Sequence, residues 1–184
     1  MKALLDTNIV IHREASKLIN KDIGQLFFWL DKTKHEKYLH PLTVDEINRY
    51  KDSQVVSVMN IKLDSYNILK TEAPFDEPIK SISSSMDTTP NDIIDSKLLN
   101  ELIHERVDVF ITEDRRIHKK ANLLKIDNRV FSIESFIEKC ISENPSLVDY
   151  SVLSVKRLLL GKVNLSDSFF DSFREDYLGF NKWF

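Results

Sequence analysis

Short apolar runs alternate along this chain with longer stretches in which apolar residues recur at helical spacing. The runs have the length of buried strands and are bounded by turn-forming residues, whereas the longer stretches have the period of amphipathic helices. Strands that alternate with helices indicate βαβ units and a parallel sheet covered on both faces. The pattern predicts strands at 2–6, 37–42, 107–112 and 128–133, and helices at 14–31, 43–50, 53–70, 91–106, 113–124 and 133–143.

Local signals set the boundaries of two of these helices. Thr43 and Glu46 have the spacing of a capping box, so a helix is predicted to begin at Thr43. Thr89 is a suitable N-cap, and Pro90 a suitable first residue, for the helix at 91–106. The segment 71–90 holds three of the five prolines and a Ser/Thr cluster, and it is predicted to be a loop.

Composition limits the classes of function. With 184 residues the chain suits one domain plus an appendage, and its three glycines exclude a Gly-rich phosphate loop. The formal net charge of −3 argues against a wholly electrostatic nucleic-acid binder, although it allows a local basic stripe. No apolar run approaches the roughly 20 residues that cross a bilayer, so no membrane partner is expected. The single cysteine, Cys140, is typical of a reducing compartment and favours the cytoplasm.

Acidic residues fall where the predicted strands end. One ends the first strand, one lies in the helix after the second strand, two share a face of the helix at 91–106, and one follows the strand at 107–112. The ligand crevice of a parallel α/β sheet lies outside the carboxyl ends of its strands, so these acids are expected to converge there. They are Asp6, Glu46, Asp92 with Asp95, and Asp114.

Carboxylates packed together repel one another, and divalent cations remove that repulsion. Mg²⁺ and Mn²⁺ prefer oxygen ligands, and two such ions about 4 Å apart can activate water and stabilise the leaving oxygen of a phosphodiester. Each acid also has a structural interpretation, which stays open at this point. Asp6 suits an Asx-turn, Glu46 a capping box, Asp92 and Asp95 a helix dipole, and Asp114 a helix cap.

Four segments, in order, resemble the motifs of the PIN-domain family of metal-dependent nucleases. They are "LLDTNIVI", "TVDEINRY", "NDIIDSKLLNEL" and "VFITEDRRI", and the resemblance covers about residues 1–140. The fourth reads "TED" where the family more often has "TND" or "TRD". The resemblance implies a three-layer α/β/α PIN-like fold with a short central parallel sheet at 1–143, and a C-terminal extension or connector at 144–184.

The resemblance also implies roles for individual residues. Asp6, Glu46, Asp95 and Asp114 take the catalytic and metal-binding positions, with Asp92 as an additional metal-binding acid. Asn8 and Thr112 take supporting positions beside these acids. The basic residues nearest the acids, Arg13, Arg115 and Arg116, are candidates for binding substrate phosphates, although such residues usually form solvated helix faces.

The expected function is therefore a Mg²⁺- or Mn²⁺-dependent endoribonuclease that hydrolyses single-stranded or structured RNA with metal-activated water. Two alternatives stay open: a catalytically weak module that binds RNA or a protein partner, and the toxin of a toxin–antitoxin pair. A response-regulator-like phospho-acceptor is an unrelated α/β alternative, but it needs a lysine at a late strand exit, and this sequence has no lysine placed there. The protein could also form a homodimer.

The tail "DSFFDSFREDYLGFNKWF" resembles the connector that precedes a GNAT-type acetyltransferase domain, which would make this chain part of a longer polypeptide. Alternatively, it is a C-terminal helix with its own aromatic packing.

Overall fold

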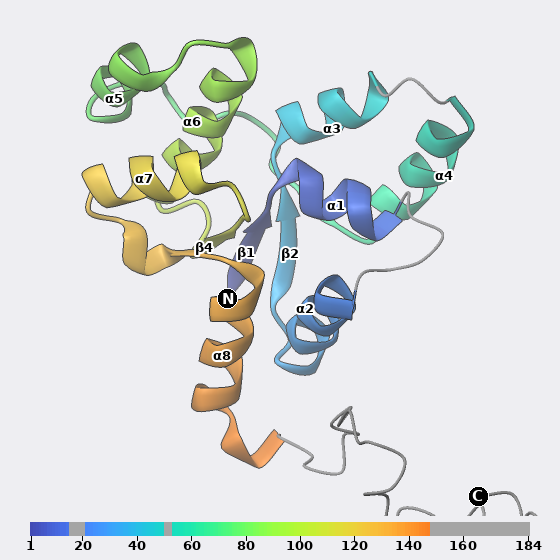
Figure 1. Ribbon diagram of the computed structural model, residues 1–184. Helices are drawn as coiled ribbons and strands as arrows, with labels where there is room; N and C mark the ends of the chain where they lie inside the picture. Colours follow the sequence, from blue (N-terminus) through green and yellow to red (C-terminus); the bar gives the residue numbers. More distant parts are fainter. Residues whose placement is uncertain (15–20, 50–52, 148–184) are drawn as a thin grey trace, which may run out of the picture. The chain divides into compact units, whose positions relative to one another are not determined.

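Five parallel strands form the centre of the molecule (Figure 1). The computed structural model describes residues 1–14, 21–49 and 53–147. The strand order is β3-β2-β1-β4-β5, and β1 pairs with both β2 and β4. The strands are β1 Lys2–Leu5, β2 Glu36–Leu39, β3 Asn67–Ile68, β4 Val109–Ile111 and β5 Val130–Phe131.

Eight α-helices accompany the sheet in the described residues. Of these, α5, α6 and α7 lie together against one face, while α2 contacts both α1 and α8 on the other side (Figure 1). The helices are α1 Thr7–Glu14, α2 Lys21–Lys32, α3 Pro41–Asn48, α4 Ser53–Leu63, α5 Ile79–Met86, α6 Pro90–Ile103, α7 Arg115–Leu123 and α8 Ile133–Glu143. Short 3₁₀ turns occur at Asp127–Arg129 and Pro145–Leu147. The predicted three-layer α/β/α arrangement around a short parallel sheet is thus confirmed.

The central strands are buried on both faces, as their apolar sequences predict. Ala3, Leu4 and Leu5 are all fully buried. Leu4 and Phe110 belong to the core beneath α6 and α7, where they meet Leu98. Burial of this kind stabilises the folded state by about 25 cal/mol for each Å² of apolar surface. It therefore holds the sheet in place, together with the residues at the strand ends.

One helix was not predicted, and two local predictions were wrong. The unpredicted helix, α1, begins directly after β1, where the Asp6 carbonyl accepts hydrogen bonds from the backbone N–H groups of Ile9 and Val10. The helix α3 begins at Pro41 with His40 as its N-cap, so Thr43 and Glu46 form no capping box. The segment 71–90 contains the helix α5, whose Ile79 is fully buried.

Other boundaries moved by smaller amounts. The helix predicted at 53–70 ends at Leu63 and is followed by the short strand β3. The helix predicted at 14–31 corresponds to α2, and residues 15–20 lie outside the described residues. The cap at Thr89 and the first residue Pro90 were predicted correctly for α6.

A compact unit spans Met1–Leu147. The predicted extension at 144–184 lies, from residue 148 onward, outside the described residues, and so does the proposed connector sequence. Among the described helices, none combines the length and the apolar character needed to span a lipid bilayer.

Candidate metal centre

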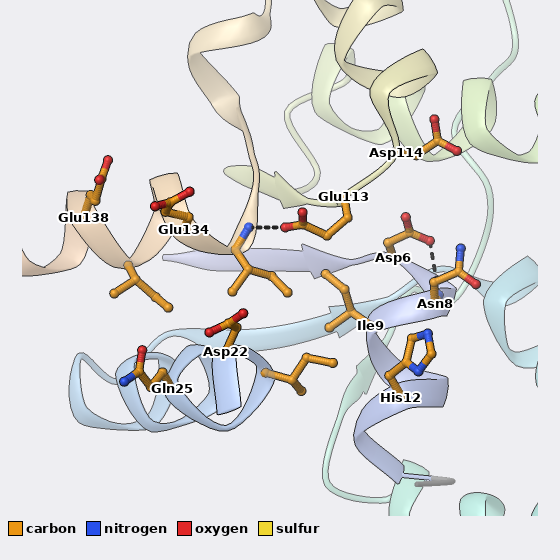
Figure 2. A pocket seen from close by; sticks show the side chains of 13 residues that line it. Asp6, Asn8, Ile9, His12, Asp22, Gln25, Glu113, Asp114, Glu134 and Glu138 are labelled. Atoms are coloured by element: carbon orange, nitrogen blue, oxygen red, sulfur yellow. Dashed lines mark hydrogen bonds between the residues drawn. The ribbon is translucent and has the colours of Figure 1, made fainter. Parts of the chain in front are cut away.

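Asp6 lies at the carboxyl end of β1, where β1 separates β2 from β4. Its side chain is 6% exposed. Oδ2 accepts a hydrogen bond from the Thr112 hydroxyl at 2.5 Å. Oδ1 accepts one from the Asn8 backbone N–H at 3.3 Å, which Figure 2 shows. Burial raises the pKa of Asp6, and the charges of Asp114 and Glu46 raise it further, against the opposing effect of the two hydrogen bonds.

Thr112 connects Asp6 to a second acid. It follows β4 and is fully buried, and its Oγ1 also accepts a hydrogen bond from the backbone N–H of Asp114 at 3.0 Å. Asp114 is the N-cap of α7, because its carboxylate accepts from the backbone N–H of Arg116 at 2.6 Å. The pairing of Leu5 with Ile111 brings these two strand ends level. Asp6 and Asp114 therefore lie at the same edge of the sheet.

Asp95 and Glu46 complete the group from α6 and α3. Both side chains are half-buried, and neither has a hydrogen bond or ion pair with another described residue. Burial raises the pKa of Asp95 to about 7, and the negative charge of Asp6 adds to this rise. Glu46 in turn raises the pKa of Asp6. Asp114 and Glu46 thus both act on Asp6, and Asp6 and Asp114 both act on Asp95. These four predicted acids are here called the acid cluster: Asp6, Glu46, Asp95 and Asp114.

The acid cluster fits a divalent cation in its donor chemistry. Its four members offer carboxylate oxygens, the ligands that Mg²⁺ and Mn²⁺ prefer. In the described residues, however, no three His, Cys, Asp or Glu side chains are arranged so that they could hold one ion. Asp6 and Asp114 accept the hydrogen bonds described above, whereas Glu46 and Asp95 have no such partner among the described residues.

Asp92 has a structural role in the first turn of α6. One oxygen accepts from the backbone N–H groups of Thr88 and Thr89 and from the Thr88 hydroxyl, and the Thr89 hydroxyl completes a capping box. The other oxygen pairs with the Arg116 guanidinium at 2.6 Å. The hydrogen bonds, led by that of the Thr88 N–H, hold the pKa of Asp92 well below its usual range.

The predicted substrate-binding arginines occupy different environments. Arg13 lies over the Phe27 ring, with 4.9 Å from its guanidinium carbon to the ring centroid. Arg116 is paired with Asp92, although its side chain is 57% exposed. Arg115 is exposed in the first turn of α7 and has no ion pair with another described residue.

Sequence reasoning missed a buried lysine beside the cluster. Lys120 and Asp87 are each 2% exposed and form an ion pair at 2.6 Å. The Lys120 ammonium also donates to the Ser96 hydroxyl at 2.9 Å and to the Asp92 carbonyl at 2.7 Å. Its charge lowers the pKa of Asp95, against the larger rise caused by burial and by Asp6. Helical periodicity could have found it, because Lys120 shares a helix face with Ile117 and Ala121.

A groove of about 860 Å³ extends from Asp6 and Asp114 between α1, α2 and α8. Figure 2 shows Asp6, Asn8 and Asp114 at one end of this groove and Glu134 and Glu138 at the other. Four isoleucines also line it: Ile9, Ile23, Ile133 and Ile137. Glu113, the unusual residue of "TED", accepts a hydrogen bond from the Ile133 backbone N–H at 2.6 Å and so joins the β4 exit to α8.

The fold is similar to that of a solved structure. It is a PilT N-terminus domain protein from the hyperthermophilic archaeon Sulfolobus solfataricus, with 16% sequence identity and a TM-score of 0.42. The alignment covers 77% of this chain and 94% of that one. No protein-family model and no curated protein matches the sequence.

Proposed function

We propose that this chain is a PIN-type nuclease that hydrolyses RNA with the help of a divalent metal ion. The observation that carries the proposal is the meeting of Asp6 and Asp114 at one sheet edge through Thr112, with Glu46 of α3 acting on Asp6 and with Asp6 acting on Asp95 of α6. Structural ion-pair networks normally contain their own cations, whereas Lys120 is the one positive side chain among the described causes of the pKa shifts of Asp6 and Asp95.

The acid cluster would hold Mg²⁺ or Mn²⁺, with Asp95 in place of Asp92 as the third acid. Asp92 is a poor candidate because its two oxygens already bind the helix cap and Arg116. A divalent ion, when bound, supplies a Lewis acid that activates water and stabilises a leaving oxygen of a phosphodiester. Thr112 would orient Asp6 throughout, since it donates to one Asp6 oxygen.

The substrate backbone would approach over α7. Arg115 and Lys119 are exposed on this helix, directly after Asp114, and cations of this kind bind phosphates. The groove is unsuited to a polyanion, because its lining includes Asp22, Glu134 and Glu138 as well as Asp6 and Asp114. RNA would therefore cross the end of the groove at the acid cluster instead of following its length.

The decisive experiment compares cleavage of single-stranded RNA, structured RNA and single-stranded DNA by the full chain with Mn²⁺, Mg²⁺ or chelator. Asp6→Asn should abolish cleavage, and Asp45→Asn should leave it intact, because Asp45 is exposed on α3 beside Glu46. Metal-dependent cleavage that survives in Asp6→Asn would reject the proposed site.

The same assay tests a second candidate function, a module that binds RNA or a protein partner without cleaving it. This alternative is favoured by the lack, in the described residues, of three acids arranged for one ion. RNA binding by the wild type, with no cleavage in any metal and no rise of the melting temperature with Mn²⁺, would support it over the nuclease.

A further inference from the structure

His40 is a fully buried histidine between β2 and α3. Its Nδ1 accepts a hydrogen bond from the Leu42 backbone N–H at 3.2 Å, which makes His40 the N-cap of α3. Because Nδ1 accepts, the ring proton is assigned to Nε2. That nitrogen lies 3.2 Å from Oε1 of Glu101 and donates to it.

Glu101 is equally buried, on α6. Its Oε1 also accepts from the Ala73 backbone N–H at 2.8 Å, and its Oε2 pairs with the Arg106 guanidinium at 2.9 Å. Oε1 therefore accepts two hydrogen bonds, while Oε2 lies beside the Arg106 charge without a hydrogen bond. Removing one partner of such a buried charge is costly, because the desolvation of the charge is then left uncompensated.

The pair joins two helices that carry members of the acid cluster. Glu46 follows His40 on α3, and Asp95 precedes Glu101 on α6. The main packing contacts of α3 are with α1 and α4, so the hydrogen bond to Glu101 is a distinct tie to α6. A second buried tie joins α3 to α1, where the Thr7 and Thr43 hydroxyls lie 3.1 Å apart.

We propose that His40 and Glu101 are positioning residues, which hold α3 against α6 so that Glu46 lies near Asp6. This inference rests on the proposed function for its consequence in catalysis, although its geometric content can be tested without metal or RNA. A pair with a purely structural role would lower stability when broken and leave the interaction of Glu46 with the other acids unchanged.

The metal-free test is a comparison of melting temperatures across three backgrounds of the full chain. Glu46→Gln should raise the melting temperature of the wild type, because it removes repulsion from Asp6. The same change should have little effect in His40→Asn, since asparagine can still cap α3 but cannot reach Glu101. The control background is Phe136→Leu, a core change in α8, a helix that carries none of the four acids.

The melting temperatures in the three backgrounds either support the positioning role or overturn it. A rise on Glu46→Gln in the wild type and in Phe136→Leu, lost in His40→Asn, supports the positioning role. An equal rise in all three backgrounds overturns it. The absence of any rise in the wild type also overturns it, because Glu46 then has no close acidic neighbour to be positioned against.

A second readout concerns metal binding. His40→Asn should weaken Mn²⁺ binding, measured by calorimetry, by about 10–100-fold, as outer-shell substitutions do, and should lower kcat more than it raises KM. Glu101→Ala should act similarly, whereas Glu101→Gln should restore most of the affinity, because its amide oxygen can still accept from His40 and Ala73. Phe136→Leu should leave Mn²⁺ affinity unchanged.

The two hypotheses can fail separately. A wild-type protein that binds no Mn²⁺ rejects the proposed nuclease, while the melting-temperature comparison still decides whether His40 positions Glu46. Equal Mn²⁺ affinity in wild type and His40→Asn rejects the positioning role while leaving the nuclease intact.

Discussion

The first and second turns of α6 carry aspartates whose charges the fold treats in opposite ways. Asp92, in the first turn, is bound by two backbone N–H groups, two hydroxyl contacts and Arg116, and its pKa is held low. Asp95, one turn later, has no hydrogen-bonding partner among the described residues, and burial raises its pKa to about 7. A carboxylate with all its partners in place stabilises the protein, whereas one without partners is suited to a ligand that arrives from outside.

The largest expected difference between the two turns is in catalysis. Asp95→Asn should reduce RNA cleavage by about 1000-fold, because a metal ion supplies several kcal/mol to the transition state and each 1.4 kcal/mol is a factor of ten. Asp92→Asn should retain cleavage within a few-fold. Single-turnover kinetics at saturating Mn²⁺ measure both. Equal losses in the two variants would contradict the division of roles between the turns.

The next difference is in stability and has the opposite order. Asp92→Ala should lower the melting temperature by a few degrees, since it removes the capping box and the partner of Arg116. Asp95→Asn should raise the melting temperature of the metal-free protein, because a buried charge and its repulsion from Asp6 disappear. Calorimetry in the presence of chelator tests both changes, and a loss of stability in Asp95→Asn would show that its charge has a partner.

A smaller effect is the dependence of stability on pH. The pKa of Asp95 is about 7 in the folded protein and about 3.9 in an unfolded chain, so between these values only the folded state keeps the proton. The stability contributed by this group is therefore lost as the pH rises from about 4 to 7. The melting temperature of Asp95→Asn minus that of the wild type should increase over this range in metal-free buffer and then level off. A flat difference would indicate an ordinary pKa.

The smallest expected effect is on RNA affinity. Arg115→Ala should weaken RNA binding a few-fold and reduce the salt dependence by about one phosphate contact, because Arg115 is exposed and without an ion pair among described residues. Arg116→Ala should affect the melting temperature more than the affinity, since Arg116 is paired with Asp92. Salt titrations of RNA binding, made with chelator to prevent cleavage, separate the two. A larger affinity loss in Arg116→Ala would reverse this assignment.

The same helix shows how far sequence reasoning extends. The cap at Thr89 and the start at Pro90 were predictable, because capping depends on residues within one turn. The different surroundings of Asp92 and Asp95 were not predictable, since Asp92 pairs with Arg116, which is distant in sequence. The tie between His40 and Glu101 also joins residues far apart in the chain, and only the fold brings them together.

The elements that the sequence did not predict correctly also depend on contacts between residues far apart in the chain. The sequence after Asp6 looks like a turn because Thr and Asn satisfy backbone groups locally, yet Thr7 instead bonds Thr43 and α1 begins at once. The Ser- and Pro-rich segment around α5 looks like a loop, but burial of Ile79 in the core stabilises a helix there. In both places, tertiary packing outweighs local propensity.

The groove beside the acid cluster has a consequence for any measurement of metal affinity. Six carboxylates line it, and no Lys or Arg is found among its described lining residues. Such a cleft attracts counter-ions from the surrounding solution, so the local cation concentration near Asp6 exceeds that of the bulk buffer. Potassium or sodium at high concentration would screen the carboxylates and reduce this local enrichment of divalent cations. Apparent dissociation constants for the metal, measured at different ionic strengths, would then differ even if the coordinating side chains behaved identically.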